Sequence, residues 1–266
     1  MGQIVFIGLG LHDDHGISLN GLEEVRAADK VFAEFYTNLL PEFSLERFES
    51  LAGKKLTLLS RRDLEDMNGQ TILEAAEKGS VVVLVPGDPM IATTHVALRI
   101  EAQKRGVKTR IVHGASILSA AAGLSGLHNY KFGKSVTVPF PDENTSATPY
   151  RVVAENRKRG LHTLCLLDIK ADEKRYLKVS EALTALLSIE AKEGKGVVTL
   201  GTLAVGISRA GSQNPAVKAE RAEFLLDYDF GGPPQCVIFP GRLHFMEAEA
   251  LIALAGAPES IREAIK

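Results

Sequence analysis

Short apolar runs alternate with segments of helical periodicity along the first half of the chain. Runs rich in Val, Ile and Leu are typical of buried strands, and apolar residues spaced three and four apart indicate helices. We predict strands at Gln3–Ile7, Val31–Phe35, Leu56–Leu59, Val81–Val85 and Thr109–Val112. Helices are predicted at Leu19–Ala28, Leu45–Leu51, Arg62–Lys78 and Thr94–Arg105. This alternation of strands and helices predicts a mainly parallel sheet with helices on its faces.

A second set of strands and helices follows after about residue 112. Strands are predicted at Ser135–Val138, Thr163–Leu167, Leu203–Ser208 and Cys236–Phe239. Helices are predicted at Ser116–Leu124, Tyr150–Arg159, Ser180–Glu190 and Leu243–Ala255. The Pro- and Ser/Thr-rich stretch Pro139–Pro149 predicts an exposed loop. We therefore expect an α/β protein of two domains, residues 1–112 and 113–266.

Composition excludes several classes of protein. The 266 residues are 45% hydrophobic and 24% charged, with a net charge of −2. A length of this order allows one large domain or two, and the near-neutral charge argues against a nucleic-acid binder that depends on a broad basic surface. No apolar run is long enough for a membrane helix, and the N-terminus lacks the basic region and cleavage site of a signal peptide. With Cys165 and Cys236 both in apolar runs, which suits reduced thiols, we expect a cytoplasmic protein.

The turn Gly8-Leu9-Gly10 after the first strand is the first candidate for ligand binding. A dinucleotide fingerprint requires a third glycine at position 13, where the chain has Asp13. A carboxylate there would also repel a pyrophosphate, and no phosphate-binding P-loop sequence occurs elsewhere in the chain. Two interpretations stay open, namely a strand end where a ligand contacts the backbone and a turn without function.

Asp88 is the second candidate, because it follows the apolar strand Val81–Val85. Gly87 permits backbone conformations that other residues avoid, and Pro89 holds Asp88 in an extended conformation. Ligands of open α/β sheets bind at this carboxyl end of the strands. The alternative is an aspartate that serves only the turn. His95, shortly after, either supports this loop from behind or lies at the surface.

Several sequence blocks together resemble the diphthine synthase family of the tetrapyrrole methylase superfamily. The blocks are Gly8–Leu11, Ala33–Thr37, Pro86–Pro89 with Ala92–His95, Tyr130–Ser135, Leu167–Lys170, Ser208–Ser212 and Pro240–His244. The Gly87-Asp88-Pro89 element belongs to the whole superfamily, whereas Ala33–Thr37, Tyr130–Ser135 and Asp168–Lys170 are specific to this family. The resemblance extends in order from residue 6 to about residue 257.

The resemblance implies an S-adenosylmethionine-dependent N-methyltransferase of two α/β domains, with the cofactor in the cleft between them and S-adenosylhomocysteine as product. The implied substrate is translation elongation factor 2. The amino group of its 3-carboxy-3-aminopropyl-histidine would be methylated three times to give diphthine, a step of diphthamide biosynthesis. The family also implies a homodimer.

The resemblance places the cofactor contacts on strand ends and turns. Carried over by motif, they are Leu11, Asp88, Ile91, Ser116, Ile117, Leu167, Ala210 and Gln235. The last position is often His in relatives. Gln keeps an amide donor and acceptor without a charge, so we expect a weaker contact there or one through the backbone.

The chemistry does not single out a catalytic residue. Methyl transfer from a sulfonium depends mainly on proximity and orientation, and an α-amino group with a pKa of about 8 loses its proton readily. Candidates for orienting the substrate arm and for meeting its carboxylate are Glu34, Tyr36, Thr37, Lys134 and Lys170. His12 and His15, with Asp13 and Asp14 between them, could bind a metal, but a three-residue spacing in a loop is weak evidence for a metal site, so we predict no metal.

Two other functions remain as alternatives. The first is a methyltransferase of the same superfamily that acts on a corrin precursor or on ribosomal RNA. Corrinoid enzymes usually carry a proline in the first glycine turn, which Gly8–Leu11 lacks, and the net charge disfavours RNA. The second alternative is a non-catalytic module that binds an adenosyl ligand.

Overall fold

The computed structural model describes residues 2–142 and 146–265, apart from the side chains at positions 172 and 264. The chain divides into two compact units. Unit 1 holds the residues up to Ile117 together with Lys170–Lys174, and unit 2 holds Leu118–Ile169 together with the residues from Arg175 onwards. No pattern in the sequence indicated that Lys170–Lys174 groups with unit 1.

Unit 1 contains a five-stranded sheet in which all strands are parallel. Its order is β3-β2-β4-β1-β5, formed by β1 (Gln3–Gly8), β2 (Lys30–Glu34), β3 (Leu56–Leu59), β4 (Ser80–Val85) and β5 (Lys108–Val112). The helices are α1 (Leu19–Ala27), α2 (Leu45–Ala52), α3 (Gln70–Lys78) and α4 (His95–Lys104). The predicted parallel sheet with intervening helices is confirmed.

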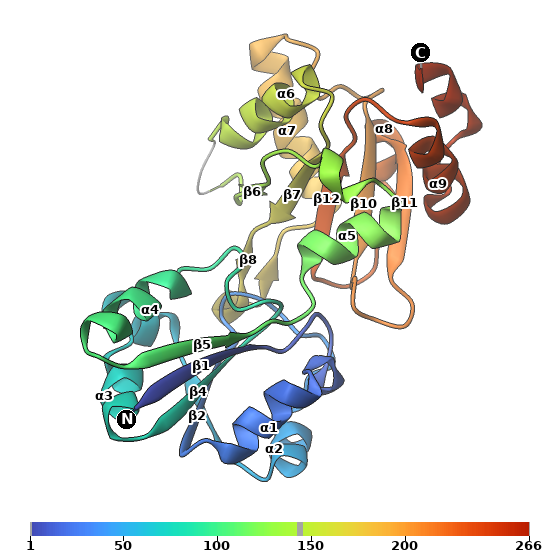
Figure 1. Ribbon diagram of the computed structural model, residues 1–266. Helices are drawn as coiled ribbons and strands as arrows, with labels where there is room; N and C mark the ends of the chain where they lie inside the picture. The colour runs from blue at the N-terminus through green and yellow to red at the C-terminus, as the bar shows by residue number, and fades with distance from the viewer. Residues whose placement is uncertain (1, 143–145, 266) are drawn as a thin grey trace. The chain divides into compact units, whose positions relative to one another are not determined.

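Helices cover both faces of this sheet, so its central strands are apolar on both sides (Figure 1). Val5 and Ile7 of β1 pack in one core with residues of α1 and α2. Ile4 and Phe6 point the other way and pack with α3 and α4. This burial on both faces explains why β1 and β4 read as continuous apolar runs without alternation.

The predicted helix Arg62–Lys78 is wrong in its first part. The structure has a π-helical turn at Arg62–Asp66, and α3 begins only at Gln70. Asn68 and Gly69 between them both have positive φ angles, 50° and 67°. Because an α-helix cannot continue through left-handed residues, the segment divides at this point.

Unit 2 contains a second five-stranded sheet, of order β11-β10-β12-β7-β6. Its strands are β6 (Val136–Val138), β7 (Thr163–Leu167), β10 (Leu203–Ser208), β11 (Ala216–Arg221) and β12 (Gln235–Phe239). Only β6 and β7 run parallel, and the other pairs are antiparallel. A separate two-stranded ribbon pairs β8 (Ile169–Lys170) with β9 (Arg175–Tyr176).

The helices of unit 2 again cover both faces of the sheet (Figure 1). They are α5 (Ile117–Ser125), α6 (Thr148–Lys158), α7 (Val179–Glu193), α8 (Ala222–Leu225) and α9 (Phe245–Ala255). One core joins α6, α7 and α8 to β7 and β12, and α5 and α9 lie over the opposite face. Part of the loop expected at Pro139–Pro149 lies outside the described residues, and α6 begins before that expected loop ends, at Thr148.

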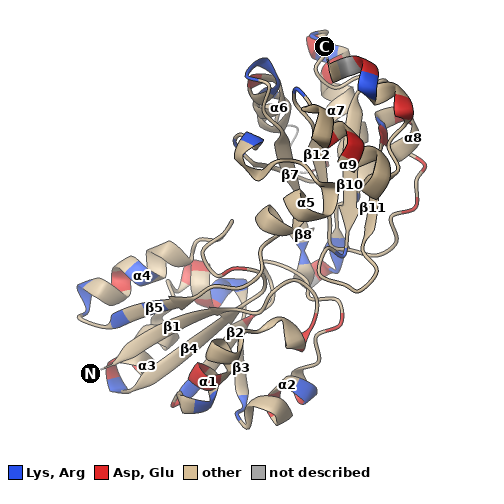
Figure 2. Ribbon diagram, turned by 45° about the vertical axis from the view of Figure 1, so that its right-hand side comes forward, with Lys and Arg blue, Asp and Glu red and all other residues tan. Residues whose placement is uncertain are grey.

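Charged residues of both signs are spread over the helices and loops of each unit (Figure 2). This distribution agrees with the net charge of −2. Among the residues that the structure describes, no helix combines the length and apolar character that crossing a bilayer requires.

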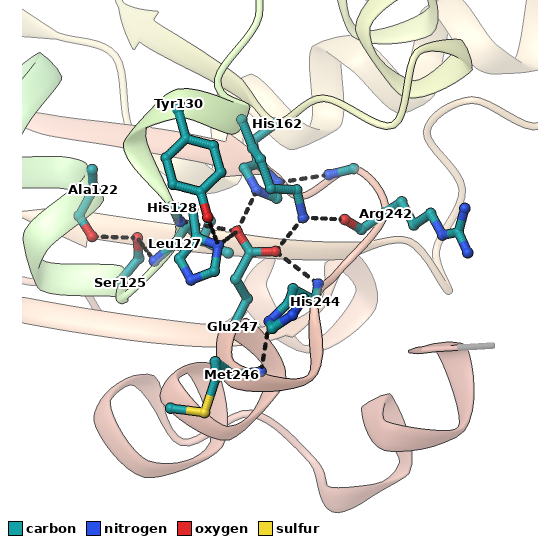
Figure 3. A network of polar contacts seen from close by, with 12 residues as sticks. Ala122, Ser125, Leu127, His128, Tyr130, His162, Arg242, His244, Met246 and Glu247 are labelled. Atoms are coloured by element: carbon teal, nitrogen blue, oxygen red, sulfur yellow. Dashed lines mark hydrogen bonds and ion pairs between the residues drawn. The ribbon is translucent and has the colours of Figure 1, made fainter.

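A buried carboxylate, that of Glu247 near the start of α9, joins several loops of unit 2 (Figure 3). Its Oε1 accepts hydrogen bonds from the His128 backbone N–H and from His162 Nε2, both at 2.9 Å. Its Oε2 accepts from the His244 backbone N–H at 2.8 Å and from Lys131 Nζ. Lys131 and His244 come from two of the blocks that carry the family resemblance, so these blocks hold unit 2 together.

The network also fixes the protonation of its members. His162 Nδ1 accepts a hydrogen bond from the Gly241 N–H at 2.9 Å, so Nε2 carries the proton that His162 donates to Glu247. Burial disfavours the ionised form of Glu247, but hydrogen bonds from Lys131, the backbone and His162 outweigh it and lower its pKa to about 2. Burial lowers the pKa of His162, which suits a neutral imidazole.

Candidate active site

Three glycines meet where β1, β4 and β5 end. A Cβ on Gly8 would lie 2.4 Å from the Gly87 carbonyl oxygen and 2.6 Å from the Gly114 nitrogen, and a Cβ on Gly114 would meet the same oxygen at 2.4 Å. Gly10 and Gly87 also exchange two backbone hydrogen bonds, of 3.2 and 2.6 Å. Because these strands are neighbours in the order β4-β1-β5, their carboxyl ends form one glycine edge, in which backbone packs directly against backbone. The sequence indicated the first two glycine turns but not Gly114.

Asp88 follows this edge and is held by two hydrogen bonds. Its Oδ1 accepts from the Met90 N–H at 2.9 Å, and its Oδ2 accepts from His113 Nδ1 at 2.7 Å. The carboxyl group is 8% exposed, whereas the His113 side chain is 72% exposed. Sequence reasoning missed His113 as a partner of Asp88. Its position directly after β5, two strands away from β4 in the sheet, was the available signal.

Glu34, at the end of β2, is fully buried and acts on the turn that follows. Its two carboxyl oxygens accept from the Thr37 hydroxyl at 2.6 Å and from the Thr37 N–H at 3.2 Å. His95 lies behind it, with Nε2 at 3.7 Å from Glu34 Oε1 and Nδ1 at 3.1 Å from the Pro89 carbonyl oxygen. Of the two alternatives for His95, support of the Asp88 loop from behind is therefore the observed one.

The protonation of this pair follows from its partners. A carbonyl oxygen only accepts, so Nδ1 of His95 carries a proton, and Nε2 has no hydrogen-bond partner among the described residues. Burial raises the pKa of Glu34 to about 7, against the opposing effect of the Thr37 hydrogen bonds, with a small contribution from the nearby Glu65. Burial lowers the pKa of His95. At neutral pH the pair therefore avoids two buried charges.

We expect the variant Glu34→Gln to change how stability depends on pH. A raised folded-state pKa means that Glu34 contributes stability fully below its ordinary value of 4.5 and loses it as the pH rises through 7. A Gln side chain does not titrate. The free energy of unfolding of the Glu34→Gln variant, minus that of wild type, should therefore rise by about 2 kcal/mol between pH 5 and pH 8. Urea titrations at both pH values measure this difference. The exposed Glu46 provides the control Glu46→Gln, and equal pH profiles for wild type and Glu34→Gln would contradict the expectation.

The other candidates for substrate contact belong to different elements of the two units. The Tyr36 hydroxyl is buried and has no partner among the described residues, with Arg61 at 5.5 Å from its ring centroid. Burial raises the pKa of Tyr36 above its ordinary value. Lys170 belongs to unit 1, where its Nζ lies 3.5 Å from Glu173, and Lys134 is exposed in unit 2. Their roles toward a substrate remain predictions.

The cofactor residues expected in unit 1 gather at the glycine edge. Leu11 follows Gly10 after β1, and Ile91 lies in the loop after β4, where its N–H donates to the Asp88 carbonyl oxygen at 3.3 Å. Ser116 and Ile117 follow β5 and begin α5. The structure therefore brings Leu11, Asp88, Ile91, Ser116 and Ile117 to the ends of three adjacent strands.

The cofactor residues expected in unit 2 also lie at neighbouring strand ends. Leu167 ends β7, Ala210 follows β10, and Gln235 begins β12, which pairs with both strands. The Gln235 side chain accepts from the Val179 N–H and donates to the Gly231 carbonyl oxygen, each at 2.9 Å. Both ends of the amide are thus engaged within the unit.

No three His, Cys, Asp or Glu side chains in residues 2–142 and 146–265 gather in a way that could hold a metal ion. The chemistry at the two edges instead consists of backbone groups, one anchored carboxylate and a few unpartnered polar atoms. Such an arrangement suits a small organic ligand held largely by main-chain contacts.

Comparisons with known proteins agree with this picture. Residues 3–219 match the model of the tetrapyrrole (corrin/porphyrin) methylases. The chain is 51% identical to a diphthine synthase of Methanococcoides burtonii, covering 98% of both chains. It is 45% identical to the diphthine synthase of Methanocaldococcus jannaschii, covering 94% of this chain and 97% of that one. A crystal structure of diphthine synthase superposes with a TM-score of 0.90 at 44% identity, covering 98% of this chain and 99% of that one. The chain therefore belongs to the tetrapyrrole methylase family and, within it, to the diphthine synthases, which are methyltransferases of diphthamide biosynthesis.

Proposed function

We propose that the protein transfers methyl groups from S-adenosylmethionine to the amino group of the 3-carboxy-3-aminopropyl-histidine of translation elongation factor 2. Three successive transfers would give diphthine. The observation that carries the proposal is the edge of closely packed glycines beside Asp88, at the ends of β4, β1 and β5. It occurs in a chain that is about half identical to diphthine synthases over nearly its whole length.

The residues present fit this cofactor. The adenosine and the amino acid tail of S-adenosylmethionine offer polar groups that main-chain N–H and C=O groups can bind. Its sulfonium is a cation, so few cationic side chains should lie beside the sulfur. Gly8 and Gly114 pack against the main chain of Gly87, beside which an added Cβ would meet only the Ala115 carbonyl oxygen, at 4.0 Å. Asp88 offers a carboxylate that the Met90 N–H holds in place. The residues that would hold the cofactor are Leu11, Asp88, Ile91, Ser116, Ile117, Leu167, Ala210 and Gln235. When bound, the cofactor supplies an activated methyl group.

The protein's own contribution is to orient the acceptor and to remove water from it. The acceptor amine must be unprotonated, and partial desolvation lowers the pKa of an amine, so no strong base is needed. Glu34 fixes the turn that carries Tyr36 and Thr37, and His95 fixes the Pro89 carbonyl of the Asp88 loop. We propose that these turns position the substrate arm. We also propose a cytoplasmic homodimer, whose mass light scattering would measure.

The direct test supplies labelled S-adenosylmethionine and unmethylated elongation factor 2. We expect label on the factor and, by mass spectrometry, a final gain of three methyl groups. Label on a corrin precursor or on RNA but not on the factor would assign the protein to the first alternative function. Binding of the cofactor without transfer to any of these acceptors would favour the non-catalytic module.

The variant Asp88→Asn tests the cofactor edge. Asn keeps the side-chain acceptor for the Met90 N–H and removes the charge, so the loop should persist. We expect the affinity for S-adenosylmethionine, measured by calorimetry, to fall at least about tenfold, as for loss of a charged hydrogen-bond partner. The melting temperature of the free protein should change by only a few degrees. The exposed Asp66 provides the control Asp66→Asn, and an unchanged affinity for Asp88→Asn would remove Asp88 from the site.

A further inference from the structure

Arg209, directly after β10, has an unusual backbone conformation. Its φ angle is 50°, in the left-handed region that non-glycine residues seldom adopt. Two backbone hydrogen bonds hold it there, from its own N–H to the Pro234 carbonyl oxygen and from the Ser212 N–H to its carbonyl oxygen, each 2.9 Å. Such strain is concentrated at functional sites, where the surrounding structure maintains it.

The side chain of Arg209 has no partner among the residues that the structure describes. Its Nε is buried and makes no hydrogen bond, and no carboxylate forms an ion pair with the guanidinium. The Ser212 hydroxyl, from the same turn, is also buried without a partner. A buried N–H or hydroxyl that lacks an acceptor is costly. These two donors, one of them part of a guanidinium cation, therefore indicate a place for a ligand that accepts hydrogen bonds and carries negative charge.

The surroundings of Arg209 connect it to the expected cofactor edge of unit 2. Ala210 is the next residue, and Gln235 is paired with Ser208 in the sheet. The guanidinium lies against Gly231, where an added Cβ would come within 3.0 Å of Nη2. Gly231 in turn accepts the hydrogen bond of the Gln235 amide. The unpartnered donors thus lie at the strand ends where a ligand is expected.

We propose that Arg209, assisted by Ser212, is a receptor for the carboxylate of a 3-amino-3-carboxypropyl group. This inference rests on the proposed function, in which two molecules carry that group, namely the cofactor on its sulfur and the acceptor on its histidine. A planar guanidinium matches a carboxylate through two parallel hydrogen bonds, which the point charge of a lysine does not.

Calorimetry with two adenosine ligands separates the cofactor from the acceptor as the source of the carboxylate. S-adenosylhomocysteine carries the 3-amino-3-carboxypropyl group, and 5′-methylthioadenosine lacks it. If Arg209 binds the cofactor, Arg209→Met should lower the affinity for S-adenosylhomocysteine at least about tenfold and leave the affinity for methylthioadenosine unchanged. Arg209→Lys should recover only part of the loss. If Arg209 binds the acceptor, both affinities stay unchanged and the KM for elongation factor 2 rises at least about tenfold.

Two further variants distinguish a binding role from a structural one. Glycine adopts a φ of 50° without strain, and no side-chain hydrogen bond is lost, so Arg209→Gly should melt within about 3 °C of wild type. Arg221, exposed at the end of β11, provides the control Arg221→Met, which should change neither affinity nor KM.

Four results would overturn the carboxylate receptor. The first is that Arg209→Met weakens the binding of both adenosine ligands equally, and the second is that it changes neither the two affinities nor the KM. The third is that Arg221→Met has the same effects as Arg209→Met. The fourth is a marked fall in the melting temperature of Arg209→Gly. If wild-type protein does not methylate elongation factor 2, the proposed function fails, and the calorimetry still tests the cofactor carboxylate. Unchanged S-adenosylhomocysteine binding in that case would overturn both proposals.

Discussion

Replacing Gly8 by alanine should destabilise unit 1 by about 4 kcal/mol or more and abolish cofactor binding. The added Cβ would lie 2.4 Å from the Gly87 carbonyl oxygen, 2.6 Å from the Gly114 nitrogen and 2.7 Å from the Gly114 Cα. All of these are backbone atoms, so no side chain can rotate away, and the ends of three adjacent strands must separate. Urea unfolding monitored by circular dichroism, together with calorimetry with S-adenosylhomocysteine, measures both effects.

Gly123 provides the matched control for this substitution. It lies within α5, and a Cβ there would meet no atom within 4 Å. Alanine favours a helix over glycine, so Gly123→Ala should stabilise the protein by about 0.5–1 kcal/mol. If Gly8→Ala were as stable as Gly123→Ala, the close approach of the three strand ends would be disproved.

The variant Glu247→Ala should destabilise unit 2 by about 3–5 kcal/mol, because it removes one member of a buried ion pair and leaves the other uncompensated. Lys131 loses its carboxylate, and the His162 Nε2–H and two backbone N–H groups lose their acceptor. Glu249, in the same helix, is 48% exposed and pairs with Arg262 at the surface. The control Glu249→Ala should therefore change the free energy of unfolding far less than Glu247→Ala does. Similar costs for the two variants would contradict the structural role of Glu247.

The same network predicts the direction of the pH dependence. The pKa of Glu247 is lowered from 4.5 to about 2, so its ionised form contributes stability that is present above pH 4.5 and is lost as the pH falls through 2. The stability difference between wild type and Glu247→Gln should accordingly shrink between pH 5 and pH 2. Chemical unfolding at a series of pH values measures it, and a constant difference would show that the pKa of Glu247 is the same in the folded and the unfolded protein.

The sequence predicted most of unit 1, because a parallel sheet buried on both faces leaves continuous apolar runs. β1 and β4 are such runs, and each predicted strand of the unit is present. Unit 2 was harder to predict from pattern. The edge strand β11 is only partly buried and contains Lys and Glu, so it lacks the apolar run that marks a strand. Its short connection from β10 makes the pair antiparallel.

Predictions of the site succeeded where a single segment carries the chemistry. The turns at Gly8 and Asp88 could be identified because glycine and proline determine which conformations the local backbone can adopt. Contacts between distant segments could not be foreseen. His113 and Asp88 are 25 residues apart in sequence, and Glu34 and His95 are farther apart. Only the order of the strands places them together, and that order does not follow from the spacing of apolar residues.

The Glu247 network has a consequence for how this enzyme family can diverge. Lys131, Gly241 and His244 belong to blocks by which the chain is recognised. Within unit 2, Lys131 and His244 donate to the buried acid, and Gly241 donates to His162, which does so too. The role of these residues in unit 2 is to hold its scaffold, independently of the molecule that is methylated. Acceptor specificity could therefore drift among homologues that keep these blocks intact. Reassigning a substrate within the superfamily should depend on the residues at the strand ends, above all those beside Asp88 and Arg209.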